Sequence, residues 1–287
     1  MFSFCKMQAT GNDFIIVDYT KSKFEYSFKL LAKYLCDRHY GVGADGLIIL
    51  DKSKVADLKM RIFNPDGEEA EMCGNGIRCF AKYVYEYGII QKESFCIETL
   101  AGIKDIELTV EGKTVIKIKI AMGEPIFEYD KIPVIYSDIN YEKTKENIEK
   151  LSINSIKIEG NEFYPISIGN PHVVCFVNNV EEINIEEIGK KVENYKYFPN
   201  KTNVEFVEII DENKIKVRIW ERGVGETLSC GTGSCAATVI SHIIKSTNCD
   251  LTVDLKGGNL KIQYDKDKKM IYLEGDAMEI FVGNIKI

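Results

Sequence analysis

The pattern of apolar and polar positions occurs twice along this chain of 287 residues. In each half, a short apolar run typical of a β-strand is followed by an amphipathic stretch with helical period. Farther along each half, alternating apolar and polar residues predict paired strands. The strand, helix and paired-strand segments are 14–17, 28–35 and 107–120 in the first half, and 173–177, 185–192 and 251–264 in the second. The two halves are therefore predicted to contain the same elements in the same order.

Two further segments, at residues 77–87 and 235–244, are apolar on nearly every face. A helix of this kind must be buried on all sides, so each half is predicted to wrap its strands around one central helix. We therefore assign the α+β fold class. The expected architecture is two pseudo-symmetric lobes from an internal duplication, each a barrel-like, mostly antiparallel sheet around a central helix.

The bounds of the expected lobes follow from the repeat. The N-terminal lobe is expected at 1–120, completed by the C-terminal strand at 276–287, and the C-terminal lobe at 121–275. A stretch rich in lysine and glutamate, at 141–149, is the expected excursion between the lobes.

The composition excludes several classes of protein. With 45% hydrophobic residues the chain can bury a full core, and a net charge of −7 argues against the basic surface of a nucleic-acid-binding protein. The sequence shows no signal peptide and no apolar span of about 18 residues, so we expect a cytoplasmic protein with no membrane partner. Nine cysteines, an odd number spread over a long chain, argue against a secreted disulfide framework.

Each central helix is preceded by a cysteine in a glycine-rich motif. The motifs are Cys73-Gly74-Asn75-Gly76 and Cys230-Gly231-Thr232-Gly233, which lie 157 residues apart (230 − 73). Small residues leave the backbone N–H groups of a helix start free to bind an anion, and the same field lowers the pKa of a thiol from about 8.5. One cysteine per half suggests two thiols that meet across a pseudo-twofold axis. A reaction on two mirror-image faces of one carbon needs such a pair.

Two other interpretations of the glycines and cysteines are disfavoured. Residues 41–46 match the G-x-G-x-x-G pattern, but they follow a predicted helix and open a strand, whereas a dinucleotide site follows a strand and opens a helix. Cys79 and Cys235 follow the helix-start cysteines after five and four intervening residues, rather than the two or so typical of zinc knuckles and thioredoxin-like sites. We therefore expect no metal site.

Polar residues near the loops of both halves predict a binding pocket. An asparagine amide both donates and accepts hydrogen bonds, and Glu221 stands at the position that Asn64 has in the first half. His172, one of three histidines, opens a predicted strand. Each residue alone is explained by a turn or a solvated ion pair, but their matched positions favour a pocket. The recurring asparagines are Asn12, Asn64, Asn170 and Asn203.

Together these motifs resemble those of the diaminopimelate epimerases, which are cofactor-independent amino-acid racemases with two cysteines. The resemblance runs along essentially the whole chain, and Asn75 separates the first cysteine motif from that of the proline racemases. One departure is Gly46, where some members carry glutamine, so a polar contact from that position is absent here. The stretches that carry the resemblance are 6–14, 63–67, 72–79, 169–172, 221–227 and 229–237.

The resemblance implies a reaction and a set of site residues. The reaction is the interconversion of LL- and meso-diaminopimelate, in lysine and peptidoglycan synthesis, by a homodimer that needs no cofactor. Cys73 and Cys230 would exchange the roles of thiolate base and thiol acid, with His172 serving Cys73 and Glu221 serving Cys230. The substrate-binding residues would be Asn12, Asn64, Gly74, Asn75, Asn170, Asn203, Glu221, Arg222, Gly231 and Thr232. A proline-type two-cysteine racemase and a thiol redox or metal-binding protein are the alternatives.

Overall fold

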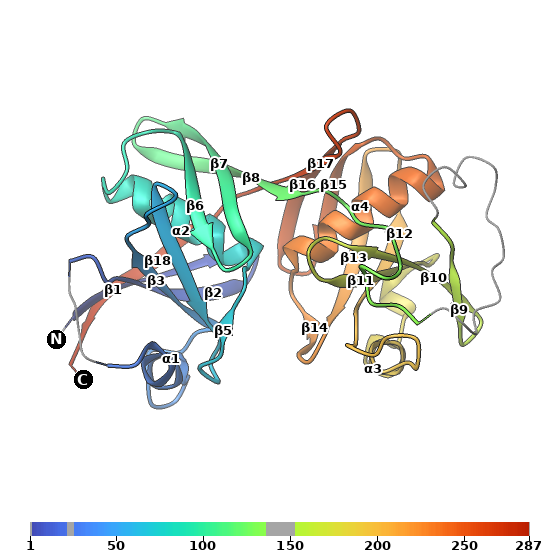
Figure 1. The fold of residues 1–287 in the computed structure, drawn as a ribbon, viewed down its shortest axis with the longest axis horizontal. Helices are drawn as coiled ribbons and strands as arrows, with labels where there is room; N and C mark the ends of the chain where they lie inside the picture. The colour runs from blue at the N-terminus through green and yellow to red at the C-terminus, as the bar shows by residue number, and fades with distance from the viewer. Residues whose placement is uncertain (1, 22–25, 136–152, 287) are drawn as a thin grey trace. The chain divides into compact units, whose positions relative to one another are not determined.

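A computed structural model describes residues 2–21, 26–135 and 153–286, in two compact units (Figure 1). The first unit is Met1–Ala121 with Glu274–Ile287, and the second is Met122–Leu273. Strands dominate both units, which confirms the predicted α+β class. The expected excursion at 141–149 lies outside the described residues.

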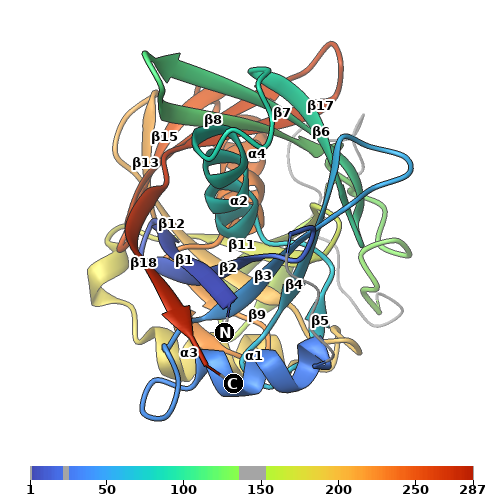
Figure 2. The same ribbon diagram turned by 90° about the vertical axis from the view of Figure 1, so that its left-hand side faces the viewer.

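In the first unit, paired strands surround the helix α2, as Figure 2 shows. The pairs β18–β1, β1–β2, β3–β4, β6–β7 and β7–β8 are antiparallel, while β2–β3 and β4–β6 are parallel. Ile77 and Phe80 on α2 are fully buried, as expected for a helix that is apolar nearly all round. The elements are β1 (Phe2–Ala9), β2 (Asn12–Asp18), α1 (Phe28–Cys36), β3 (Gly46–Asp51), β4 (Leu58–Phe63), β5 (Glu69–Ala70), α2 (Gly74–Glu86), β6 (Ser94–Thr99), β7 (Gly102–Glu111), β8 (Thr114–Gly123) and β18 (Met278–Ile285).

The second unit repeats this arrangement around the helix α4. The pairs β9–β10, β10–β11, β12–β13 and β15–β16 are antiparallel, while β11–β12 and β13–β15 are parallel. Val239 and Ile240 on α4 are fully buried. The elements are β9 (Ile156–Ile158), β10 (Asn161–Ser167), β11 (Pro171–Phe176), the 3₁₀-helix η2 (Val180–Glu182), α3 (Ile185–Glu193), β12 (Asn203–Ile209), β13 (Lys214–Glu221), β14 (Gly225–Thr227), α4 (Gly231–Lys245), β15 (Asp250–Leu255), β16 (Gly258–Asp265) and β17 (Met270–Gly275).

The duplication extends to the strand register. Leu47 lies opposite Phe63 in the first unit, and the residues 157 positions later, Val204 and Trp220, lie opposite one another in the second. Register decides which face of a strand each side chain occupies, so the two units place matching sequence positions on matching faces.

An ion pair at matching positions of the two units lies just before each cysteine in the sequence. Arg61 makes two hydrogen bonds of 2.7 Å to the carboxylate of Glu69, and Arg218 Nε donates to Glu226 Oε1 at 2.8 Å. These pairs join β4 to β5 and β13 to β14, and both β5 and β14 end three residues before a cysteine. The same local geometry therefore presents Cys73 and Cys230 at the start of a buried helix.

Candidate functional site

Cys73 and Cys230 occupy the same position relative to their helices. Each is the residue directly before the first helical turn, with φ and ψ of −138° and 122° for Cys73 and −134° and 121° for Cys230. The N–H groups of a first helical turn have no partner within the helix, so they are available to an anion. The helix starts are thus built alike, while their side-chain surroundings differ.

Cys73 is half-buried and lies beside Asn12. Its thiol donates to Asn12 Oδ1 at 3.8 Å, and Asn12 Nδ2 donates to Asp45 Oδ2 at 2.9 Å. Asp45 also accepts from Arg38, which binds Asp13 at 2.9 Å. Burial alone would raise the pKa of Asp13, but hydrogen bonds from Arg38 and Lys6 hold it well below its usual range. The loop that carries Asn12 is therefore anchored by fixed charges.

Asn75 turns its side chain into the first unit. Its Oδ1 accepts from Arg78 Nη2 at 2.9 Å and from Thr10 Oγ1 at 3.2 Å, and the side chain is buried. Arg78, which is fully buried, also donates to the carbonyl of Gly74 at 3.1 Å. The side-chain oxygen of Asn75 thus braces the helix start.

Cys230 is buried beside a carboxylate. Glu221 is near enough for its charge to act on the thiol, and the sulfur lies 3.4 Å from Thr232 Oγ1. Burial, and secondly the charge of Glu221, raise the pKa of Cys230 well above the usual value for a thiol. The sequence analysis predicted a lowered pKa at both helix starts, and for Cys230 that prediction was wrong. Loss of solvent and a nearby negative charge outweigh the favourable field of the helix.

The carboxylate of Glu221 is oriented by a neighbouring hydroxyl. Its Oε1 accepts from Thr227 Oγ1 at 2.6 Å, which orients the carboxylate, and burial raises the pKa of Glu221. A carboxylate whose pKa is raised is a stronger base than one in water. The predicted service of Glu221 to Cys230 stays a prediction.

His172 lies in the unit that carries Cys230 and is fully buried. Its Nδ1 is 2.7 Å from Glu205 Oε1, and its Nε2 is 2.9 Å from Asn170 Oδ1. Asn170 Nδ2 in turn donates to Thr232 Oγ1 at 3.4 Å. A line of polar contacts thus runs from Glu205 to the helix start at Cys230. The predicted pairing of His172 with Cys73, which lie in different units, stays a prediction.

Glu205 was missed by the sequence analysis. It is fully buried in β12, where burial raises its pKa, and its neighbours along the strand are apolar. Charged side chains are almost never fully buried unless they are paired. A glutamate in the middle of an apolar strand is therefore the signal that would have identified it.

Three of the predicted binding residues lie away from the two cysteines in sequence and make contacts within loops and strands of their own unit. Asn203 is buried, and its amide donates to the carbonyl of Pro171 at 2.8 Å and accepts from the N–H of Arg222 at 2.9 Å. The Asn203 side chain thus holds the backbone of Arg222, which is an exposed residue. Asn64 is exposed in a turn, where its carbonyl accepts from Gly67 N at 2.8 Å.

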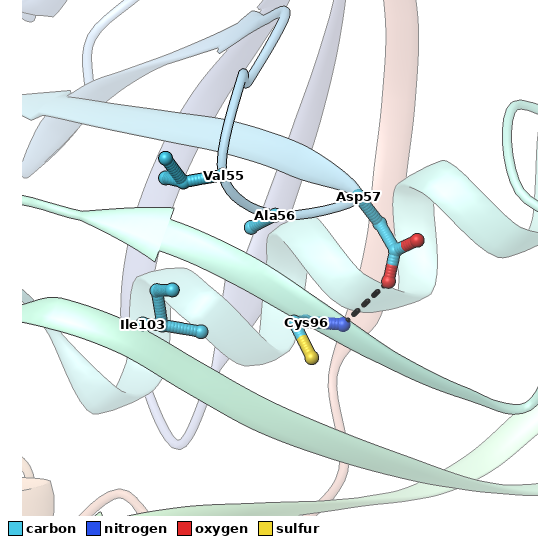
Figure 3. A pocket seen from close by; sticks show the side chains of 5 residues that line it. All are labelled: Val55, Ala56, Asp57, Cys96 and Ile103. Carbon is cyan, nitrogen blue, oxygen red and sulfur yellow. Dashed lines mark hydrogen bonds between the residues drawn. The ribbon is translucent and has the colours of Figure 1, made fainter.

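A shallow pocket in the first unit involves other residues (Figure 3). Asp57 Oδ2 accepts from the N–H of Cys96 at 2.8 Å there. Among the described residues, no group of three or more His, Cys, Asp or Glu is suited to hold a metal, and no helix is long and apolar enough to cross a membrane. The pocket is lined by Val55, Ala56, Asp57, Cys96 and Ile103.

The sequence is similar to those of known proteins along nearly its whole length. The family model described as diaminopimelate epimerase matches residues 4–128 and 164–280. A diaminopimelate epimerase from Caldanaerobacter subterraneus subsp. tengcongensis is 45% identical over 286 residues, covering 99% of each chain. One from Methanococcus maripaludis is 45% identical over 284 residues, again with 99% of each chain covered.

Solved structures with lower identity share the fold. A phenazine biosynthesis protein of the PhzF family from Bacillus anthracis has a TM-score of 0.70 at 20% identity, covering 100% of this chain and 99% of that one. A probable proline racemase from Agrobacterium radiobacter has a TM-score of 0.70 at 11% identity, covering 100% of this chain and 93% of that one. At these identities the similarity concerns the fold alone.

Proposed function

The chain belongs to the diaminopimelate epimerase family, and from this membership we propose that it interconverts LL- and meso-diaminopimelate. The observation that carries the proposal is the pair of helix-start cysteines, which share one backbone conformation at matched positions of the two units. Inversion of a carbon requires removal of a proton from one face and delivery of a proton to the other. Two thiols on opposite faces do this without any turning of the intermediate.

We assign the two thiols different roles toward each epimer. Cys230 carries its proton at neutral pH, because burial and Glu221 raise the pKa of the thiol. Cys230 is therefore the proton donor in the resting enzyme. We assign Cys73 the role of thiolate base toward the epimer that this form of the enzyme converts. For the opposite epimer, Glu221 takes the proton of Cys230, whose thiolate then becomes the base, and Cys73, protonated from solvent before the substrate binds, becomes the acid.

The helix starts stabilise the negative charge that develops as the α-proton leaves. Charge moves from the α-carbon into the α-carboxylate, which we place against the N–H groups of Gly74-Asn75 and Gly231-Thr232. Such donors act as an oxyanion hole does, and one donor contributes roughly 3–4 kcal/mol to the barrier. The reaction then requires no pyridoxal phosphate to hold the charge.

Deuterium incorporation tests the proposed function. The protein is incubated in D₂O with LL-diaminopimelate, with lysine and with proline, and the α-carbon of each is examined by mass spectrometry. We expect one deuterium in the meso product and none in lysine or proline. Labelling of proline would favour the proline-type racemase, and no labelling of any amino acid would favour a thiol redox protein.

Arg222 is assigned to the distal carboxylate of the substrate. Its guanidinium is exposed and donates to the carbonyl of Asn200 at 3.1 Å, and its backbone is fixed by Asn203. A hydrogen bond to a charged group contributes about 1.5–3 kcal/mol, so Arg222→Ala should lower kcat/KM by roughly 10- to 150-fold. Lys196→Ala, which removes another exposed cation of the second unit, is the control and should leave kcat/KM unchanged. Equal values for both variants would remove Arg222 from the binding site.

We assign the chain to the cytoplasm as a homodimer, with β18 at the interface. Met278, Ile280 and Val282 on this strand are 60%, 50% and 58% exposed, and Phe281 beside them is 46% exposed. Contiguous apolar side chains of this size favour burial against a second surface. Sedimentation should show a dimer for the wild type and a monomer for Val282→Lys. A monomeric wild type at micromolar concentration would contradict the proposal.

A further inference from the structure

The repeat shows that one unit contains a buried polar pair that the other unit lacks. By strand pairing, His172 lies opposite Asn203 as Phe14 lies opposite Gly46, so Phe14 is the counterpart of His172. The counterpart of Glu205, 157 residues earlier, is Ile48. Phe14 and Ile48 are both buried. The first unit therefore has two buried apolar side chains at the positions where the second unit has a histidine and a glutamate.

Glu205 and Ile48 occupy the same place beneath their helix starts. A Cβ added to Gly233 would lie 2.8 Å from Glu205 Oε1, and a Cβ added to Gly76 would lie 3.3 Å from Ile48 Cδ1. Glycine at both positions lets the first helical turn approach the strand below it. In the second unit, this close approach brings a carboxylate to the helix that begins beside Cys230.

The polar pair is costly for stability. Burial of charged groups requires compensation by good geometry and complete hydrogen bonding, and Glu205 and His172 are both fully buried. An apolar pair of similar volume would avoid this cost, as the first unit shows. Stability alone therefore does not account for Glu205.

We propose that Glu205 is a positioning residue that fixes the ring of His172, a candidate catalytic residue of the second unit. This inference rests on the proposed function. Glu205 Oε1 lies 2.7 Å from Nδ1 of His172 and Asn170 Oδ1 lies 2.9 Å from Nε2, so both ring nitrogens are held by groups of the second unit. Nε2 faces Asn170, and Asn170 contacts Thr232, the neighbour of the Cys230 sulfur.

Kinetics of Glu205→Gln give the first test. The amide keeps the shape of the side chain but removes the charge and offers an N–H toward Nδ1, so the ring loses its fixed tautomer. We expect kcat to fall roughly 100-fold with KM changed less than about threefold, the lower end of what a general acid or base contributes. Glu208→Gln, a carboxylate on the same strand that accepts from Val180 N at 3.0 Å, is the matched control and should keep wild-type kinetics. Wild-type kcat in Glu205→Gln would overturn the inference, whereas an inactive wild type would overturn the proposed function.

The histidine spectrum gives a readout that does not depend on activity. The chain has three histidines, so ¹⁵N-histidine labelling yields three imidazole rings, and the signals of His172 are assigned from their loss in His172→Phe. In the wild type we expect the two ring nitrogens of His172 to give signals set by their contacts with Glu205 and Asn170. In Glu205→Gln the Nδ1 signal should shift while the signals of His39 and His242 stay unchanged. An unchanged His172 ring would show that Glu205 does not fix it.

A double variant separates positioning from folding. His172→Phe with Glu205→Ile copies the apolar pair of the first unit and leaves no unpaired buried charge. We expect this protein to melt no lower than the wild type and to have lost at least 100-fold in kcat. The single variant His172→Phe should melt lower, because it leaves Glu205 buried without its partner. A double variant that melts far below the wild type would instead assign the pair a structural role and contradict the inference.

Discussion

Serine in place of either Cys73 or Cys230 should lower kcat by at least 1,000-fold, a loss of about 4 kcal/mol of transition-state stabilisation. Both positions lie directly before a buried helix, with the same backbone conformation, and serine is compatible with that position. A hydroxyl is a far weaker acid than a thiol, so serine can neither become the base at neutral pH nor return a proton at a comparable rate. Each variant loses one of the two carriers that inversion requires.

The measurement is steady-state epimerisation together with thermal unfolding. Cys96→Ser and Cys249→Ser, at half-buried cysteines of the first and second unit, serve as controls and should keep wild-type activity. All four variants should melt near the wild type. If Cys73→Ser or Cys230→Ser kept more than about a tenth of the activity, that cysteine would not carry the proton.

The duplicated fold was predictable from the sequence because it rests on local patterns. Period-two and helical patterns recur in one order, and the strand registers Leu47 to Phe63 and Val204 to Trp220 recur at the same offset. The location of each cysteine at a helix start also followed, since glycine-rich residues precede an all-apolar segment. These features depend on neighbours in sequence.

The electrostatics of the second unit were less predictable because they depend on contacts between distant strands. Glu205 and His172 are 33 residues apart in sequence and meet only because β11 and β12 pair in parallel. The fold also buries Cys230 beside Glu221, and the pKa of Cys230 is therefore raised, where a lowered pKa was expected. Asn203 likewise uses both atoms of its amide group for bonds within the fold, which no pattern of single residues could show.

Glu221→Gln should lower kcat by 100- to 10,000-fold, the range contributed by a general base. Gln keeps the hydrogen bond with Thr227 Oγ1, which is 2.6 Å in the wild type, so the loop should retain its conformation. An amide cannot take the proton of Cys230, and the form of the enzyme in which Cys230 is the base is then lost. Glu162→Gln, another carboxylate of the second unit that accepts from a hydroxyl, is the matched control and should keep full activity.

The pH profile links this loss to the carboxylate itself. Burial raises the pKa of Glu221 above its usual 4.5, so the proton-accepting form is present above that raised pKa and disappears as the pH falls through it. The wild-type kcat should therefore decline on the acid side at a pH higher than an exposed glutamate would give. Glu221→Gln should lose this acid limb, because the group that titrates is gone, while Glu162→Gln should retain it. An unchanged acid limb in Glu221→Gln would assign the titration to another group and leave Glu221 with an orienting role alone.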